Sequence, residues 1–321
     1  MSSAALAYSS PAERGRRLES EFALAARSGL AKHQKELPSK FFYDEEGSRL
    51  FDLITELPEY YQTRTEIGLF RAKAGEIASA IGPDVELVEF GAGSLLKAQI
   101  ILEALKTPRT YVPIDISGDY LRQMSAKLER ALPNLPVHPV IADFTKPLKL
   151  PATGARRAGF FPGSTIGNLT YAEALVFLCR AAALLKGGGM LIGVDLVKDP
   201  AVLHAAYNDA AGVTEAFNKN MLVRANRELD ANFDLDAFVH YAFYSPAHRR
   251  IEMHLMSLKA QKVRVAGECI SFAEGETIHT ENSLKYTPDG FRALAQEAGF
   301  TPRQIWVDPD RLFSVHWLEA A

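Results

Sequence analysis

Acidic residues end three apolar segments of the chain, and the first of these segments runs into a glycine-rich turn. The strand-like pattern VELVEF precedes Gly91 and Gly93, which lack a Cβ and so let a ligand approach backbone N–H groups at the start of a helix. Asp115 ends the next apolar segment, about twenty residues later, where nucleotide-binding folds place a carboxylate on ribose hydroxyls. Asp143 and Phe144 follow the third segment and would offer an adenine an acceptor and a stacking ring. Together, these residues favour a cofactor that contains adenosine.

The glycine turn helps to choose between two such cofactors. Its sequence, GAGSLL, lacks the third glycine that lets a helix pack close under a pyrophosphate, as NAD(P) requires. The amino-acid tail of S-adenosylmethionine needs only backbone donors and one acid, so S-adenosylmethionine fits better. Lys97, one turn into the following helix, is either a surface residue or a partner for the carboxylate of that tail.

Strand and helix patterns alternate from residue 85 to residue 196. The expected strands cover residues 85–90, 110–115, 137–142, 158–161 and 190–196, and the clearest helices between them cover residues 95–105 and 172–185. This alternation predicts an α/β fold with a doubly wound, Rossmann-like sheet. Ligands of such sheets bind outside the carboxyl ends of the strands, where the three acids stand.

The alternation stops after residue 198, and a second lobe is expected. Residues 198–235 are mainly helical in pattern. The elements expected after them are antiparallel strands over 251–258 and 261–265, a polar loop over 272–286, a helix over 291–298 and a strand over 313–318. We expect residues 62–198 and 286–321 to form the cofactor-binding domain, and residues 1–61 and 199–285 to form an α+β lobe that binds the substrate.

Composition excludes several classes of protein. The 321 residues are 47% hydrophobic and 23% charged, with a net charge of -3, which is typical of a globular protein without a dedicated nucleic-acid surface. Cys179 and Cys269 are far apart and lack metal-ligand spacing, so neither a disulfide framework nor a metal site is expected. The first residues do not follow the pattern of a secretory signal, and no apolar stretch is long enough to span a membrane. We expect a cytoplasmic monomer whose partner is a small molecule.

Eight short segments, in order along residues 35 to 290, resemble the histidine Nα-methyltransferases of ergothioneine biosynthesis. They are residues 40–48 (KFFYDEEGS), 57–64 (LPEYYQTR), 163–168 (GSTIGN), 195–199 (DLVKD), 206–209 (AYND), 226–229 (NREL), 251–254 (IEMH) and 280–283 (TENS). The resemblance implies S-adenosylmethionine-dependent trimethylation of the α-amino group of L-histidine to hercynine.

The resemblance also implies which residues form the two binding sites. The substrate pocket would contain Tyr43, Phe51, Tyr60, Gly163, Thr165, Asn168, Tyr207, Met253, Glu281 and Ser283. The cofactor site would contain Gly91, Gly93, Lys97, Asp115, Asp143 and Phe144.

Roles within the pocket follow from the family motifs. Asn168 and Tyr207 would hold the α-carboxylate, because an amide and a phenol both donate hydrogen bonds without adding a charge. Glu281 and Ser283, together with Tyr60, would recognise the imidazole ring. We expect Tyr43 to contact the reacting amine, so Tyr43 and Asn168 are the residues assigned to catalysis.

Two departures from the family pattern leave room for a different substrate or function. The glycine turn reads EFGAGSLLKA where ELGSGTSxKT is expected, and the IEMH segment ends in His254 where the family has tryptophan. Related enzymes act on tryptophan, although Met253 and Glu281 argue for histidine. An NAD(P)-dependent oxidoreductase would share the sheet but should show a third glycine and a catalytic pair for hydride transfer, and the sequence indicates neither. A non-catalytic adenosine-binding module would keep Asp115 and Asp143 but would not need Asn168, Tyr207 and Glu281 from separate segments.

Overall fold

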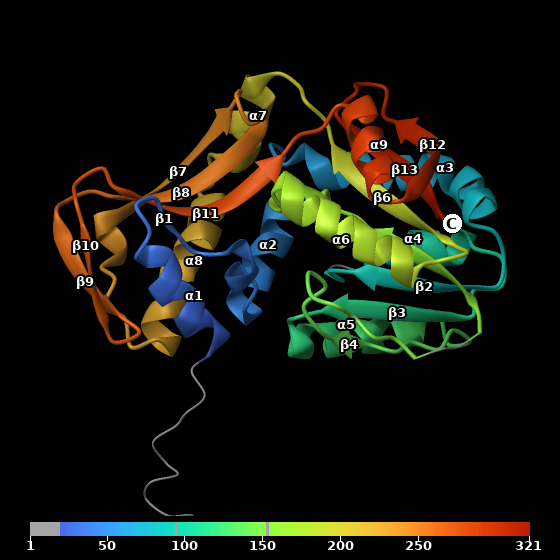
Figure 1. The fold of residues 1–321 in the computed structure, drawn as a ribbon, viewed down its shortest axis with the longest axis horizontal. Coiled ribbons are helices and arrows are strands. Elements are labelled where there is room, and N and C mark those ends of the chain that lie inside the picture. The colour runs from blue at the N-terminus through green and yellow to red at the C-terminus, as the bar shows by residue number, and fades with distance from the viewer. Residues whose placement is uncertain (1–19, 94, 152–153) are drawn as a thin grey trace, which may run out of the picture.

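The computed structural model describes residues 20–93, 95–151 and 154–321, and it places two lobes side by side (Figure 1). One lobe is built on a seven-stranded sheet with the order β12-β13-β6-β5-β2-β3-β4. Its strands are β2 (Val85–Phe90), β3 (Thr110–Asp115), β4 (Val140–Ile141), β5 (Arg156–Phe161), β6 (Gly189–Asp195), β12 (Phe300–Val307) and β13 (Phe313–Ala320).

Helices cover both faces of this sheet, so the predicted doubly wound α/β fold is confirmed. Strands β2 to β6 pair in parallel, whereas β13 is antiparallel to β6 and to β12. One face packs on α3 (Tyr61–Ile81), α4 (Leu96–Ala104) and α5 (Gly118–Ala131), and the other on α6 (Tyr171–Leu184) and α9 (Pro288–Glu297).

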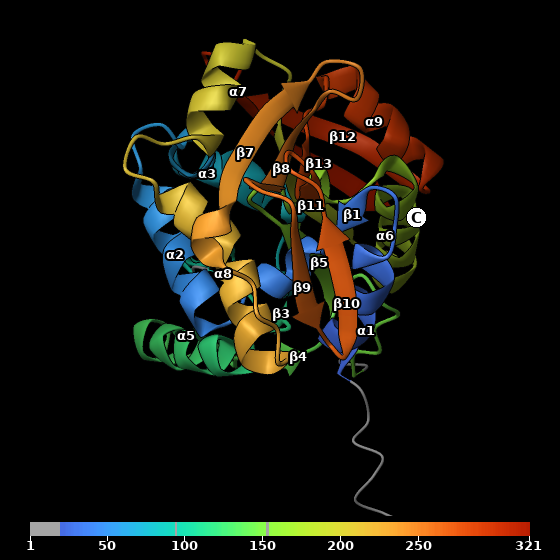
Figure 2. The ribbon, with the colours of Figure 1, turned by 90° about the vertical axis from the view of Figure 1, so that its left-hand side faces the viewer.

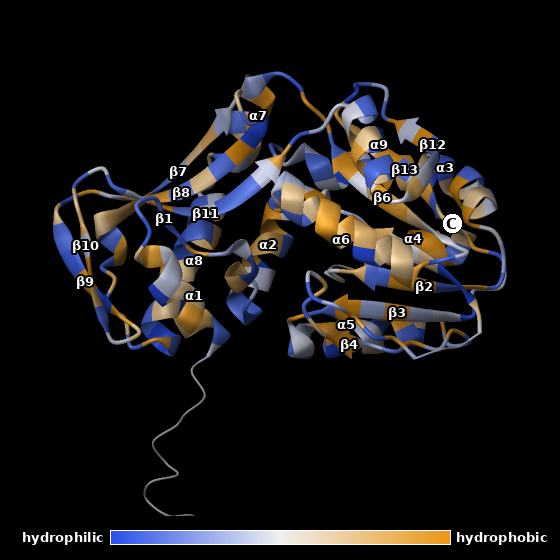
Figure 3. Cartoon of the chain, viewed as in Figure 1, coloured by the Kyte–Doolittle hydropathy of each residue, from blue (hydrophilic) through white to orange (hydrophobic). Residues whose placement is uncertain are grey.

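Strand β2 lies in the middle of the sheet and is buried along its whole length. Its side chains alternate between the two faces, so that Leu87 joins one hydrophobic cluster and Val88 the other. Hydrophobic residues also concentrate on α4 and α6, which lie next to the sheet (Figure 3). A continuous apolar run is the pattern expected of a parallel strand that is covered on both sides.

The second lobe has its own sheet and its own hydrophobic cluster. The sheet has the order β1-β11-β8-β7, and β9 and β10 form a separate hairpin. Its strands are β1 (Lys35–Glu36), β7 (Phe238–Ser245), β8 (Arg250–Ser257), β9 (Gln261–Val265), β10 (Glu268–Phe272) and β11 (Thr277–Leu284). Its helices are α1 (Glu21–Leu30), α2 (Glu45–Glu56), α7 (Pro200–Tyr207) and α8 (Val213–Glu228), with short 3-10 turns η2 (Ser39–Phe42) and η4 (Leu235–Ala237). Strands β7 and β8 run beside α8 (Figure 2).

The expectation of a polar loop over residues 272–286 is wrong, because most of this segment is strand β11. The strand pairs antiparallel with β8, and a register shift between His279 and Glu281 interrupts its alternation of buried and open positions. That bulge, together with the polar side chains that face the cavity described below, hides the strand pattern. Strands β7, β10 and β12 were also not expected, and the strand expected over 137–142 is reduced to β4, with one isolated bridge at Val137.

The polypeptide passes between the lobes at a few points. These lie near the start of α3, between the end of β6 and the start of α7, and between the end of β11 and the start of α9. Side chains also join the lobes, because Lys40 Nζ lies 3.1 Å from an Asp143 carboxylate oxygen and the Ser117 hydroxyl donates to the Tyr43 carbonyl at 2.8 Å. Among the described residues, no helix combines the length and the apolar character that crossing a membrane requires.

Two glycines provide a matched test of this packing. At Gly193 in β6, a Cβ would lie 1.9 Å from Glu66 Oε1 and 3.0 Å from the Phe313 ring, whereas at Gly75 in α3 it would meet no atom within 4 Å. We expect Gly193→Ala to lower the free energy of unfolding by about 1–3 kcal/mol through overpacking. Gly75→Ala should raise it by about 0.5–1 kcal/mol through helix propensity. Urea denaturation measures both, and equal effects of the two variants would contradict the packing described.

Candidate functional site

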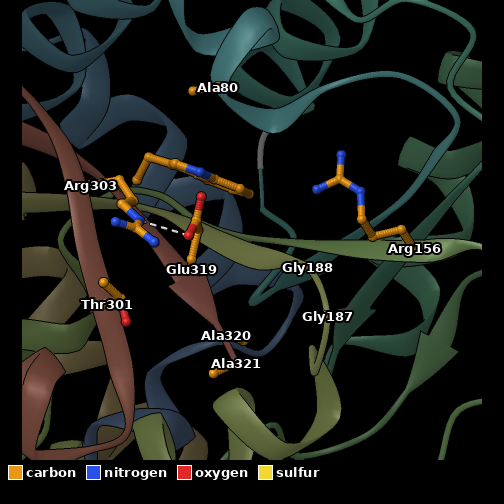
Figure 4. Close-up of a pocket in the computed structure, with 10 residues that line it drawn as sticks. Ala80, Arg156, Gly187, Gly188, Thr301, Arg303, Glu319, Ala320 and Ala321 are labelled. Atoms are coloured by element: carbon orange, nitrogen blue, oxygen red, sulfur yellow. Dashed lines mark hydrogen bonds and ion pairs between the residues drawn. The ribbon is translucent and has the colours of Figure 1, made fainter.

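A cavity of about 1440 Å³ lies between the lobes, at the carboxyl ends of β2, β3 and β5. This position agrees with the binding edge of open parallel sheets, next to the point where the strand order reverses between β2 and β5. A second, smaller hollow lies at the opposite edge, near Arg156, Gly188 and the Arg303–Glu319 ion pair (Figure 4). The start of β5 and the turn before β6 line that hollow, at the end of the strands where parallel sheets do not usually bind ligands.

The two glycines of the turn after β2 play different structural parts. Gly91 has a φ of +73°, and a Cβ there would lie 3.2 Å from the Phe144 ring. Gly93 does not have a positive φ, and a Cβ there would meet no protein atom within 4 Å. Gly91 is therefore needed by the fold. At Gly93 the lack of a side chain leaves the backbone accessible from the cavity. That arrangement fits a ligand lying against the turn.

The two predicted acids of the cofactor site both line the cavity. Asp115, at the end of β3, accepts the Ser117 backbone N–H at 2.7 Å, and burial raises the pKa of its carboxyl against that hydrogen bond. Burial also acts to raise the pKa of Asp143, but hydrogen bonds from Thr145 and Lys40 outweigh the effect of burial. The pKa of Asp143 therefore lies below its usual value. Both carboxylates are thus held in place before a ligand arrives.

Lys97 lies at the cavity, so of the two alternatives left open by the sequence the exposed surface residue is excluded. Its side chain is 14% exposed and lines the cavity, and its Nζ lies 2.7 Å from a carboxylate oxygen of Glu66, which has no exposed surface. The same carboxylate accepts the backbone N–H of Gly163 at 3.0 and 2.9 Å. Glu66 therefore links the helix after the glycine turn to the loop after β5.

Aromatic side chains form the substrate side of the cavity. The ring centroids of Tyr43 and Phe51 lie 5.7 Å apart, those of Phe51 and Tyr60 6.3 Å, and those of Tyr60 and Tyr207 6.4 Å. Burial, followed by the charge of Glu281, raises the pKa of Tyr43 well above its ordinary value. The phenol of Tyr43 thus keeps its proton at neutral pH, so it can orient a ligand but cannot act as a base.

Glu281 is the carboxylate among the residues expected in the substrate pocket. It lines the cavity from β11, and burial raises its pKa to about 7 against the opposing charge of Lys285. Ser283, two residues further along the strand, accepts a hydrogen bond from the Tyr207 hydroxyl at 2.7 Å. In the neighbouring strand, Met253 lies directly across from Glu281 in the register.

Most of the predicted site residues lie together at this cavity. The predicted residues that line it are Tyr43, Phe51, Tyr60, Gly91, Gly93, Lys97, Asp115, Asp143, Phe144, Gly163, Thr165, Asn168 and Glu281. Thr165 and Asn168 belong to the short turn η3 (Thr165–Asn168) after β5. Tyr207, Met253 and Ser283 are not among the lining residues, and each is less than 9% exposed.

The sequence analysis assigned no role to three charged residues behind the cavity wall: Glu66, Asp195 and Lys285. Glu66 is the charged residue among the buried residues of α3, and a buried acid in a helix is itself a signal of a buried partner. Glu281, Ser283 and Lys285 lie two residues apart, but Thr280 and Asn282 are polar as well, so the sequence shows no alternation that would have indicated a strand here.

Glu252, His254 and His279 form the group of described residues whose possible metal-ligand atoms lie within 4.8 Å of one another. The rings of His254 and His279 are stacked, with centroids 4.8 Å apart and planes at 18°. His254 Nδ1 lies 3.0 Å from Thr277 Oγ1, and His279 Nε2 lies 3.0 Å from the Glu281 carbonyl. Ring nitrogens in nearly parallel planes do not point their lone pairs at one metal position, so we assign no metal to this group.

The sequence matches a family model described as histidine-specific, S-adenosylmethionine-dependent methyltransferase over residues 22–320. A histidine N-alpha-methyltransferase of Mycolicibacterium smegmatis is 46% identical over 88% of this chain and 90% of the relative. One from Mycobacterium tuberculosis is 42% identical over 88% of this chain and 89% of the relative. Ergothioneine biosynthesis protein 1 of Neurospora crassa is 30% identical over 85% of this chain, which corresponds to 32% of that longer protein.

The two glycines of the turn should respond differently to alanine. We expect Gly91→Ala to lower the free energy of unfolding by about 1–2 kcal/mol, because its left-handed backbone disfavours a Cβ. Gly93→Ala should change that free energy by less than about 0.5 kcal/mol, yet weaken S-adenosylmethionine binding by about tenfold or more. Urea denaturation and isothermal titration calorimetry measure the two effects. Unchanged S-adenosylmethionine affinity in the Gly93 variant would remove this turn from the binding site.

Proposed function

The chain belongs to the family of histidine-specific, S-adenosylmethionine-dependent methyltransferases, and from this premise we propose that it methylates the α-amino nitrogen of L-histidine three times to give hercynine. This reaction would serve ergothioneine biosynthesis, the process named for the Neurospora relative. The proposal rests mainly on the position of Glu281. Its carboxylate lines the cavity beside the aromatic wall, where it could accept a hydrogen bond from a ring N–H. A substrate without such a donor would leave this buried group unpaired.

The cofactor half of the cavity has residues suited to each part of S-adenosylmethionine. When bound, this cofactor supplies a methyl group carried on a sulfonium. The backbone at Gly91 and Gly93, with Lys97, would hold the methionine tail, and Asp115 would accept hydrogen bonds from the ribose hydroxyls. The adenine would be held by the two residues after β4, Asp143 and Phe144. Because Glu66 already fixes Lys97, the ammonium needs little reorganisation to meet a carboxylate.

The substrate half would mainly align the acceptor amine. We assign Asn168 and Tyr207 to the α-carboxylate, and Glu281 and Ser283 to the imidazole, with Met253 shaping the ring pocket. Displacement at a sulfonium carbon needs an in-line neutral amine, so orientation is the main contribution that the chain can make. The rings of Tyr43 and Phe51 would also accommodate the positive charge that becomes permanent on the product.

Two further assignments belong to this proposal. We propose action as a monomer on a small-molecule substrate, which the cavity between the two lobes has room to hold. Cys179 and Cys269 are free and exposed, which supports a reducing, cytoplasmic location.

Mass spectrometry tests the reaction directly. The protein is incubated with S-adenosylmethionine and each of the common amino acids separately, and we expect a gain of three methyl groups on histidine alone. Methylation of tryptophan, or of no amino acid, would contradict the proposal. Calorimetry with NAD in place of S-adenosylmethionine is the control for an oxidoreductase, and tight NAD binding would support that function instead.

The role of Tyr43 has a separate test in Tyr43→Phe. Losing one hydrogen bond to the amine, worth about 1–1.5 kcal/mol, should lower kcat by about tenfold. Because the pKa of Tyr43 lies far above neutrality, the pH dependence of kcat between pH 6 and 9 should keep its shape. Steady-state rates for each of the three methyl transfers provide the measurement. Wild-type rates in all three steps would show that Tyr43 does not contact the amine.

A further inference from the structure

A buried group of charges lies behind the imidazole end of the cavity. The carboxylate of Asp195 has no exposed surface, and its two oxygens lie 2.5 Å from Lys198 Nζ and 2.7 Å from Lys285 Nζ. The hydroxyl of Tyr61 lies 2.8 Å from both oxygens. The two ammonium groups therefore share one carboxylate, but they differ in what else they reach.

Lys285 alone of these two lysines reaches residues assigned to substrate binding. Its Nζ lies 2.7 Å from Ser283 Oγ and 3.2 Å from the Tyr207 hydroxyl oxygen, as well as 2.7 Å from Asp195. An ammonium has three N–H donors and no acceptor, so these three contacts use all of its donors. Both hydroxyl oxygens must therefore accept from Lys285.

This arrangement limits how the two hydroxyls can be used. Tyr207 donates to Ser283 at 2.7 Å, so Ser283 Oγ accepts from both Tyr207 and Lys285. Its two lone pairs are then occupied, and its own O–H remains as a donor for another group. Without the ammonium, Ser283 could rotate and present a lone pair instead.

The same lysine also acts on Glu281. Glu281, Ser283 and Lys285 are two residues apart along an uninterrupted part of the β11 pairing, so their side chains share one face of the strand. The positive charge of Lys285 favours the ionised form of Glu281, which accepts hydrogen bonds but cannot donate them.

We infer that Lys285 is a positioning residue for substrate specificity: it makes Ser283 a donor and keeps Glu281 an acceptor, so that together they match the two ring nitrogens of a neutral imidazole. One nitrogen of that ring carries an N–H, and the other offers a lone pair. An indole has the N–H but no ring acceptor, so it would leave the Ser283 donor unpaired. This inference rests on the proposed function and deepens it.

The charge on Glu281 makes the inference visible in a pH profile. Burial raises the pKa of Glu281 and the charge of Lys285 opposes that shift, while the neighbouring phenols of Tyr43, Tyr60 and Tyr207 stay protonated near neutral pH. Removing the ammonium should raise the pKa of Glu281 further above its value of about 7. The acid limb of kcat/KM for histidine should then move to higher pH, since the acceptor form appears only above that pKa.

Lys285→Met is the test, and Lys198→Met is its matched control. Each variant removes one buried ammonium from Asp195, but only the first frees Ser283 and Tyr207. In Lys285→Met we expect KM for histidine to rise by about 10- to 100-fold while kcat changes by less than about threefold, with the acid limb shifted to higher pH. Lys198→Met should leave KM and the acid limb unchanged.

A double variant tests whether the lysine acts through the serine. We compare the fold-increase in KM caused by Lys285→Met in the wild-type and Ser283→Ala backgrounds. The increase should be at least threefold smaller in the Ser283→Ala background, because the hydroxyl donor that Lys285 directs is already missing there. Calorimetric binding of S-adenosylmethionine, whose site lies in the other lobe, shows that each variant is folded. If Lys285→Met does not bind the cofactor, Lys285→Gln replaces it, with the same expected shift of the acid limb.

Each outcome then has one meaning. Equal KM changes in the two lysine variants, an unshifted acid limb, or effects of Lys285→Met and Ser283→Ala that simply multiply would overturn the inference and leave the proposed function intact. A wild-type protein that binds S-adenosylmethionine but methylates no histidine would instead overturn the proposed function.

Discussion

Two carboxylates without exposed surface hold together the segments that surround the cavity. A buried carboxylate is stable only when cations or donors surround it, so each one fixes the segments that supply those partners. Glu66 holds Lys97 from the helix after the glycine turn and the backbone of Gly163 after β5. Asp195, at the end of β6, pairs with Lys198, just before α7, and with Lys285, just after β11. The loops that line the cavity are therefore positioned by charge as much as by packing.

These anchors explain how residues far apart in sequence can form one site. The parallel strands deliver the glycine turn, Asp115 and the GSTIGN turn to the same edge, because their carboxyl ends all meet there. The substrate lobe adds Tyr43 and Tyr60, which precede the first strand of the seven-stranded sheet in sequence, and Glu281, which follows β6. In the proposed function, the sheet would supply the cofactor site and the GSTIGN turn, and the added lobe would supply the residues assigned to the imidazole ring.

The sequence predicted the sheet better than the lobe, for physical reasons. Strand β3 has the expected limits, 110 to 115, because its run of apolar residues ends sharply at a carboxylate. Strand β11 was missed, since a bulge at His279 breaks its period and its polar residues face a cavity that the sequence does not show. Glu66 was missed because a single charged residue among the buried positions of a helix indicates a buried partner but does not tell which residue that partner is. Local patterns thus identify elements, but long-range ion pairs need the assembled fold.

The raised pKa values of the phenols show what kind of catalyst this cavity can be. Tyr43, Tyr60 and Tyr207 keep their protons, so the aromatic wall provides shape and hydrogen-bond donors but no base. Asp195 and the two lysines that pair with it lie behind that wall, and Lys285 contacts the hydroxyls of Ser283 and Tyr207. A cavity of this kind can accept a product that carries a permanent positive charge, because protonated phenols and aromatic faces add no competing charge of their own. Its rate would then depend on alignment, and its selectivity on the direction of a few hydrogen bonds.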